Sequence, residues 1–166
     1  MPLLKNGKIV EDTWTNVSDA DALPAGAVVV SLERWLEDHE VLVARPEPVG
    51  VRLMAGQSPA LIEDTLDALS LVALEFPAFT DGRSYSYARL LHRLGFSGEI
   101  RAVGNVLRDQ FLNMKRCGFD TLEIKQTETE SAWEEATGSF TAPYQSAFDA
   151  AKPIMSLREQ RMSASK

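Results

Sequence analysis

The residues best suited to chemistry lie in and just after one short segment, Phe76–Leu91, which reads FPAFTDGRSYSYARLL. Arg83 can hold a carboxylate, sulfate or phosphate with two parallel bonds, because a guanidinium presents a planar fork of donors. Asp81 could transfer a proton, since a positioned carboxylate can act as a general acid or base. The candidate anion or substrate contacts are Arg83, Ser84, Tyr85, Ser86, Arg101, Asn105, Arg108 and Gln110, and the candidate catalytic residues are Asp81 and Asp109.

Each of these side chains also has a purely structural interpretation. Asp81 and Arg83 can pair across a turn in which Gly82 supplies a positive φ. Ser84 can cap the helix that follows, which is the commonest role of a serine at such a position. Arg108 lies on the polar side of a predicted helix and can face solvent. The sequence leaves both interpretations open.

No motif for a cofactor or a metal occurs in the chain. The sequence contains neither the GxGxxG and GxxxxGK[ST] phosphate-binding patterns nor the GxSxG nucleophile motif. Its two histidines, His39 and His92, lack the spacing of a transition-metal site. Cys117, the only cysteine, is expected at the carboxyl end of a helix, where the dipole disfavours a thiolate. We therefore expect no metal and no cofactor.

Short apolar runs alternate with helical patterns along most of the chain. Repeated βα units favour an α/β fold with an open, mostly parallel five-stranded sheet of the doubly wound, Rossmann-like type, and a partial (β/α) barrel is the alternative. In either case right-handed crossovers bring the carboxyl ends of the strands, and the polar residues after them, to one edge. The predicted strands are Ala27–Leu32, Val49–Met54, Leu71–Phe76, Glu99–Val103 and Thr121–Lys125, and the main helices are Ala60–Leu69, Ser84–Leu94 and Asn105–Cys117.

A chain of 166 residues with 45% hydrophobic residues is expected to form one domain. We predict a single domain over residues 1–155, with an N-terminal β-hairpin (1–18) that turns at Asn6-Gly7, a βα core (27–125) and a C-terminal extension (126–155). Residues 156–166 are expected to be a disordered tail. A net charge of -7 and the lack of a long apolar run argue against nucleic-acid and membrane binding, so we expect a cytoplasmic protein.

The segment from Phe76 to Ile124 resembles the core of the DUF934 family, a bacterial domain of unknown function. The family pattern runs FPxFxDGRxYSxAxLLR, then GExRAxG(D/N)VLxDQ, then RCGFD. Two departures are small: Ser84 stands where glycine is common, and Asn105 where aspartate is common. Positions of the pattern are filled here by Asp81, Gly82, Arg83, Tyr85, Ser86, Arg101, Ala102, Gly104, Val106, Leu107, Asp109, Gln110, Cys117, Gly118, Phe119 and Asp120.

The resemblance implies a pathway. Members of the family are often labelled as oxidoreductases of sulfite reduction and tend to be encoded beside sulfite reductase and adenylylsulfate reductase. We therefore expect an accessory protein of assimilatory sulfate and sulfite reduction, with a small anion as ligand and either reductase as partner. Sulfite reduction uses siroheme and iron–sulfur clusters, which need several cysteines, so this chain is expected to lack a redox centre of its own.

Whether the chain is an enzyme stays open at this point. One alternative is a small enzyme acting on a phosphorylated or nucleotide substrate, whose phosphate the helix N-termini at the sheet edge would hold. Another is a structural module, in which the motif maintains the sheet edge and a homodimer surface.

Overall fold

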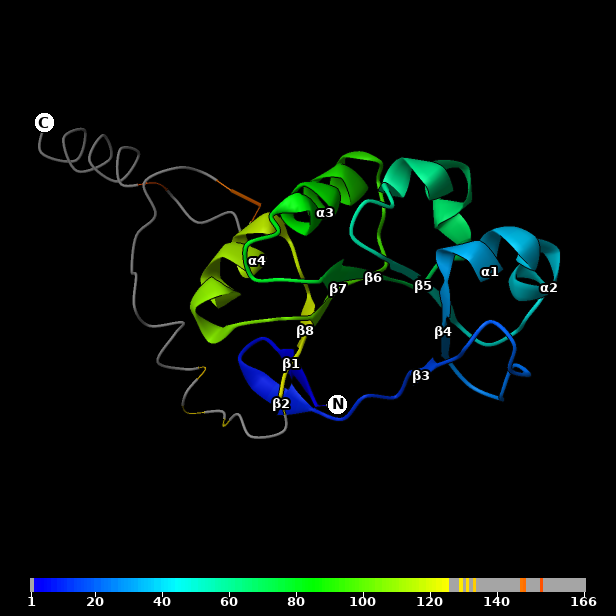
Figure 1. Cartoon of the computed structure of the whole chain (residues 1–166), viewed down its shortest axis with the longest axis horizontal. Coiled ribbons are helices and arrows are strands. Elements are labelled where there is room, and N and C mark those ends of the chain that lie inside the picture. The colour runs from blue at the N-terminus through cyan, green and yellow to red at the C-terminus, as the bar shows by residue number, and fades with distance from the viewer. Residues whose placement is uncertain are drawn as a thin grey trace, which may run out of the picture.

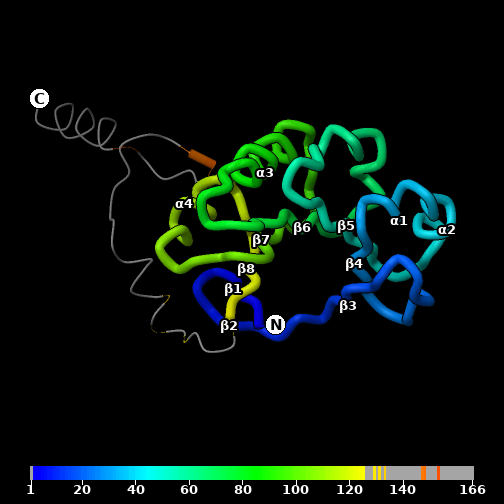
Figure 2. Tube along the Cα trace, in the orientation of Figure 1, coloured from blue at the N-terminus to red at the C-terminus, as the bar shows by residue number. Residues whose placement is uncertain are grey.

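A computed structural model of the protein describes residues 2–125 together with 129, 131, 133, 147, 148 and 153. It contains one sheet of eight strands in the order β2-β1-β8-β7-β6-β5-β4-β3 (Figures 1 and 2). Most of the predicted C-terminal extension, and all of the predicted tail, lie outside the described residues. The strands are β1 (Leu3–Lys5), β2 (Lys8–Val10), β3 (Thr15–Asn16), β4 (Val28–Ser31), β5 (Val49–Leu53), β6 (Leu71–Phe76), β7 (Glu99–Gly104) and β8 (Thr121–Glu123).

The helices follow the strands as the sequence predicts, with some differences in type. Ser58 caps the segment after β5 by accepting a hydrogen bond from the amide of Ala60, but that segment is a 3-10 helix rather than an α-helix. Gly118 ends α4 with a left-handed φ of 94°, as a C-terminal glycine commonly does. The helices are α1 (Leu32–Glu37), α2 (His39–Val43), η1 (Pro59–Ala68), α3 (Arg83–Arg93), η2 (Arg108–Gln110) and α4 (Phe111–Cys117). None of the described helices has the length and apolar content needed to cross a bilayer.

Strands β3 to β8 are parallel and lie side by side in the order in which they occur along the chain. Because the order never reverses and crossovers are right-handed, the connecting helices cover one face of the sheet (Figure 1). The expected doubly wound, five-stranded sheet is therefore wrong, and the alternative, a partial (β/α) barrel, describes the curled sheet. The extra strands are β3 and the predicted hairpin, which turns at Asn6-Gly7 and joins the sheet through β1 and β8.

The two faces of the sheet carry different side chains, because successive residues of a strand point to opposite faces. The outer face packs against the helices and holds the main core, with residues such as Val51, Leu74 and Ile100. The inner, concave face holds a second, smaller cluster of buried apolar residues, against which Trp14 packs. That cluster consists of Val29, Leu71, Ala73 and Val103.

The curl of the sheet follows from a short connection. Strands β2 and β3 form opposite edges of the sheet, yet only Glu11–Trp14 joins them. In a flat sheet of eight strands, seven spacings of about 4.8 Å would separate the outermost strands by about 34 Å. An extended chain from Val10 to Thr15 reaches roughly 18 Å. The sheet must therefore bend until its edges approach each other, and Glu11–Trp14, here called the strap, runs across the open side (Figure 1).

The strap is attached to the concave face by an ion pair between the partly buried Asp12 and the buried Arg101. Arg101, in the middle of β7, is 4% exposed, and its Nη1 donates to both carboxylate oxygens of Asp12 at 3.0 and 3.1 Å. Its Nε donates to Glu99 Oε1 at 2.9 Å. Asp12 Oδ1 also accepts from the backbone amide of Trp14, which aligns the indole with the concave cluster. A buried guanidinium needs such partners, because removing it from water unpaired is costly.

Replacing Asp12 by alanine should destabilise the fold. Arg101 would keep Glu99 but lose the strap carboxylate, so the free energy of unfolding should fall by about 1.5–3 kcal/mol, the range for a hydrogen bond to a charged group. Urea denaturation followed by circular dichroism measures the change. Asp21→Ala is the matched control: it removes an exposed carboxylate in the loop after β3 and should have little effect on the free energy of unfolding. Equal losses in the two variants would contradict the anchoring role of Asp12.

Candidate functional site

The Asp81-Gly82-Arg83 turn lies between β6 and α3 and is held by its own side chains. Arg83 Nε donates to Asp81 Oδ1 at 3.0 Å, and Nη2 donates to Oδ2 at 2.6 Å. The backbone amide of Arg83 also donates to Asp81 Oδ1, at 3.1 Å, so the carboxylate caps the start of α3. Gly82 has a φ of -89°, which any residue adopts, so the expected positive φ is wrong. The turn pairing that the sequence left open is the arrangement present.

This pairing shifts the pKa of the carboxylate. The hydrogen bonds from the Arg83 side chain and amide lower the pKa of Asp81 from 3.8 to about 2. The same bonds raise the pKa of Arg83. A carboxylate that holds its proton so weakly is a poor general base near neutral pH. The Arg83 side chain itself remains 54% exposed and lies beside the Gly56 turn after β5.

Two of the predicted contact residues are directed into the fold. Ser84 is 2% exposed and its Oγ donates to the backbone carbonyl of Glu75 at 2.6 Å, so it neither caps α3 nor points to solvent. The Tyr85 ring packs edge-on against Phe76 and Phe119, and burial raises the pKa of its hydroxyl. Both side chains connect α3 to the strands below it.

The remaining predicted residues are spread along the loops and the inner face. Arg101 belongs to the strap ion pair and lies in the middle of a strand. Gln110 Nε2 donates to the carbonyl of Phe79 at 2.8 Å, which ties the loop after β7 to the loop after β6. The structure therefore does not gather the predicted contacts around one point. Ser86, Arg108 and Asp109 are exposed, and Asn105 is half-buried.

Cys117 has no features of a reactive thiol. It is half-buried at the end of α4, and burial raises the pKa of its thiol, with the charges of Arg89 and Arg116 acting in the opposite direction. The direction agrees with the sequence-based expectation, whereas the largest cause is burial. His92 interacts through Nε2 with the carbonyl of Gly118 at 2.9 Å, as a packed helix histidine does. No cluster of three or more potential metal ligands occurs among the described residues.

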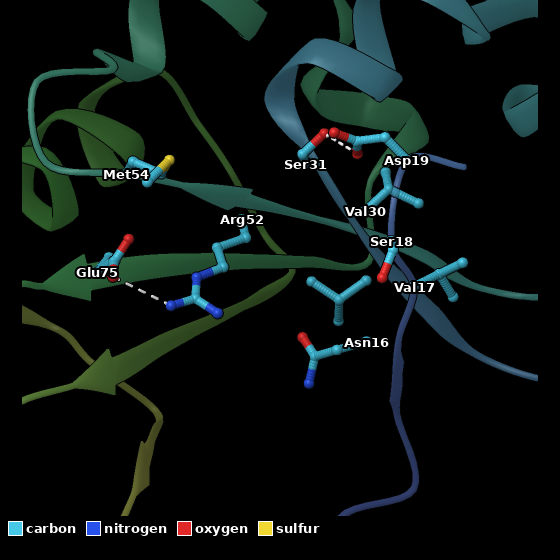
Figure 3. Close-up of a pocket in the computed structure, with 10 residues that line it drawn as sticks. Asn16, Val17, Ser18, Asp19, Val30, Ser31, Arg52, Met54 and Glu75 are labelled. Carbon is cyan, nitrogen blue, oxygen red and sulfur yellow. Dashed lines mark hydrogen bonds and ion pairs between the residues drawn. The ribbon is translucent and has the colours of Figure 1, made fainter. Parts of the chain in front are cut away.

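A cavity of about 460 Å³ opens on the concave face, at the carboxyl ends of β4, β5 and β6 (Figure 3). One wall comes from β3 and the loop after it, and the other comes from the inner face of β5 and β6. In barrels built from βα units, the carboxyl ends of the strands are the usual place for a ligand. The lining is Asn16, Val17, Ser18, Asp19, Val29, Val30, Ser31, Arg52, Met54 and Glu75.

The cavity carries charges of both signs. Arg52 Nη2 lies 3.1 Å from Glu75 Oε1, and the Arg52 side chain is 41% exposed (Figure 3). On the opposite wall the hydroxyl of Ser31 donates to Asp19 Oδ1 at 2.6 Å. Ser31 also accepts from the amide of Arg34 and thereby caps α1, which holds its side chain in place. The cavity is thus bordered by one guanidinium and two carboxylates.

The family motif and the cavity meet at Glu75. Its side chain lines the cavity, and its backbone carbonyl accepts the hydrogen bond from Ser84 in the motif helix. Gly104, another motif residue, lies beside the same strand end with a φ of 89°, and a Cβ there would be 2.7 Å from the carbonyl oxygen of Phe76. Much of the motif therefore supports the strand ends that shape the cavity.

The sequence reasoning missed the residues of the cavity. Arg52 in β5 and Glu75 in β6 are the charged residues of otherwise apolar strands, and both point to the concave face. In β7, Glu99 and Arg101 point to the same face, and of these charges only Arg101 was among the predicted contacts. Strands covered by helices on both faces are almost continuously apolar. These charges were therefore a signal in the sequence that one face of the sheet lacks a helix layer. Asp19 and Asn16 gave no comparable signal.

A comparison with known protein families identifies the family of this chain. The family model described as "Bacterial protein of unknown function (DUF934)" matches residues 50–155, which is more than half of the chain. The chain belongs to the DUF934 family. None of the curated proteins matches it. The match includes the motif segment and, in β5 and β6, the Arg52–Glu75 pair, whereas the strap and β3 precede it.

The Asp81–Arg83 pair predicts a pH-dependent contribution to stability. The folded pKa, about 2, is below the ordinary value of 3.8, so the unfolded chain binds more protons between these pH values. The pair therefore stabilises the fold fully above pH 3.8 and loses its effect as the pH falls towards 2. Carboxyl carbon shifts in an NMR titration report the pKa of Asp81 directly.

In Arg83→Ala the pKa of Asp81 should rise but stay below its ordinary value, because the backbone amide still donates to the carboxylate. Arg93→Ala, at the exposed end of the same helix, should leave it unchanged. An Asp81 that titrates near 3.8 in the native protein would show that the pair does not form in solution.

Proposed function

We propose that this DUF934 protein is an accessory protein of sulfate and sulfite reduction that binds a small ligand in its concave cavity. The observation that carries the ligand-binding part is the 460 Å³ cavity at the carboxyl ends of β4, β5 and β6. The link to sulfite reduction rests on the label and gene neighbourhood that the family resemblance implies. Sulfite reductase and adenylylsulfate reductase are the partners to test.

Arg52 is the residue best placed to hold an acidic group of the ligand. Its guanidinium borders the cavity, is partly exposed and is oriented by Glu75. Arg83 and Arg108, near the rim of the same sheet edge, are secondary contacts in this proposal. Arg83 has already satisfied part of its hydrogen-bonding capacity with Asp81, so its contribution should be the smaller one.

An accessory role is favoured over electron transfer by the chemistry of the chain itself. Iron–sulfur clusters and siroheme-type centres need cysteine ligands, and this chain has one cysteine, whose pKa is raised. An accessory protein of this kind would deliver or sense a ligand, or hold a reductase in a productive state.

A small enzyme is the second candidate, favoured by the place of the cavity. In (β/α) barrels the catalytic residues lie at the carboxyl ends of the strands, and Arg52 and Glu75 occupy such a position. This support is an analogy between folds. Absorbance and native mass of the purified protein separate the candidates: a copurified nucleotide or flavin favours an enzyme, and copurification with sulfite reductase favours the accessory role.

Growth on defined sulfur sources tests the proposed pathway. A strain lacking the gene should grow on sulfide but not on sulfite or sulfate, because the block lies at sulfite reduction. The native gene and Arg93→Gln, a change at an exposed arginine remote from the cavity, should restore growth. Arg52→Gln should fail to restore it, although the variant protein accumulates and folds.

Two results of this test would contradict the proposal. Unimpaired growth of the deletion strain on all three sulfur sources would remove the protein from sulfite reduction. Full complementation by Arg52→Gln combined with failure of Arg83→Gln would place the working site at the rim, outside the cavity.

A further inference from the structure

We infer that the cavity binds a small zwitterion, a molecule that carries an acidic group and an amino group close together. This inference rests on the proposed function, because it names the class of ligand for the same cavity. It is carried by the arrangement of charges in the lining of the 460 Å³ cavity, where the Arg52 guanidinium lies beside the Glu75 carboxylate and the Asp19 carboxylate lies on the facing wall.

The acidic group of the ligand would bind Arg52. The contact between Arg52 and Glu75 joins a single nitrogen to a single oxygen, Nη2 and Oε1, at 3.1 Å. Among the described residues no hydrogen bond is made by the Nε or Nη1 of Arg52, and Figure 3 shows the guanidinium between Glu75 and Asn16. A carboxylate or sulfonate is the natural partner for free guanidinium donors, because it accepts two parallel bonds.

The amino group of the ligand would bind Glu75. Its second oxygen, Oε2, is enclosed and has no hydrogen-bond partner in the described part of the chain. An enclosed carboxylate oxygen without a donor is costly, so its position indicates a group with N–H or O–H donors. Asp19, on the facing wall, adds a second negative charge, since in the described part of the chain its carboxylate accepts from the neutral hydroxyl of Ser31 and pairs with no cation.

A simple anion or a simple cation fits this lining less well. An inorganic anion at Arg52 would also lie near Glu75, whose negative charge repels it and whose Oε2 would still lack a donor. A simple amine would satisfy Glu75 but would face Arg52 without an acidic group to offset the guanidinium. A zwitterion gives both residues an opposite charge. Val17 and Met54, on opposite sides of the cavity, add apolar surface that an aliphatic side chain could contact.

Matched probes test this inference on the full-length protein. Each amino acid is compared with the acid that lacks its amino group and with the amine that lacks its carboxylate. For L-alanine these are propionate and ethylamine, and for L-leucine they are 4-methylpentanoate and 3-methylbutylamine. Two sizes are used because the volume of the cavity exceeds that of alanine. Dissociation constants come from titration calorimetry and from amide shifts in NMR. We expect at least one amino acid to bind, and its matching acid and amine each to bind at least tenfold more weakly.

The two charged residues should contribute to opposite parts of this selectivity. Arg52→Met should lower the affinity for the amino acid at least tenfold, so that the amino acid binds no more tightly than the matching amine. Glu75→Gln should lower the affinity for the amino acid by a similar factor, so that the amino acid binds no more tightly than the matching acid. Glu63→Gln and Arg93→Gln, both at exposed positions away from the cavity, should bind like the native protein. Circular dichroism confirms that each variant is folded.

The outcomes separate this inference from the proposed function. If an acid bound as tightly as the matching amino acid, the inference of a zwitterionic ligand would be wrong, and an amine that bound equally tightly would have the same consequence. Failure of both amino acids to bind at concentrations up to about 50 mM, at which a site with a dissociation constant of about 1 mM would be almost fully occupied, would overturn it as well. In each case, growth that still depends on Arg52 would leave the role in sulfite reduction standing, with a different ligand in the cavity.

Discussion

The shape of this protein depends on the shortness of one connection. Four residues, Glu11–Trp14, join the two outermost strands of an eight-stranded sheet, and so few residues cannot cross a flat sheet of that width. The sheet is held in a curl, and the curl creates a concave face. The ion pair between Asp12 and the buried Arg101 then fixes the strap against the middle of that face.

The strap divides the concave face into two parts. Trp14 packs against the small apolar cluster of Val29, Leu71, Ala73 and Val103, whose side chains are buried. After the strap the chain continues into β3, and β3 with the loop after it forms one wall of the cavity. One stretch of chain therefore closes the interior and leaves an opening at the carboxyl edge. The family motif supports the opposite side, since Ser84 and Gly104 hold the ends of β6 and β7.

Sequence reasoning predicted the elements better than their assembly. Strands such as Leu71–Phe76 are short apolar runs with clear ends, and local signals such as Asn6-Gly7 predict their own turns. The order of the strands and the curl of the sheet depend on how distant strands pair, which no local pattern encodes. The Asp81–Arg83 pair was foreseen as one alternative, because both partners lie in one turn. The hydrogen bond from Ser84 to the carbonyl of Glu75 was not predicted, because a serine hydroxyl can donate to any nearby carbonyl.

The edges of the sheet have a further consequence for the protein at high concentration. Exposed edge strands offer free backbone groups to other chains, and long flat edges promote strand-to-strand aggregation. Here the edges are β2, with three residues that include Lys8, and β3, with two. The six-residue strands β6 and β7 lie in the middle, paired on both sides. The strand order that bends the sheet thus also keeps its longest strands, β6 and β7, from pairing with strands of neighbouring molecules.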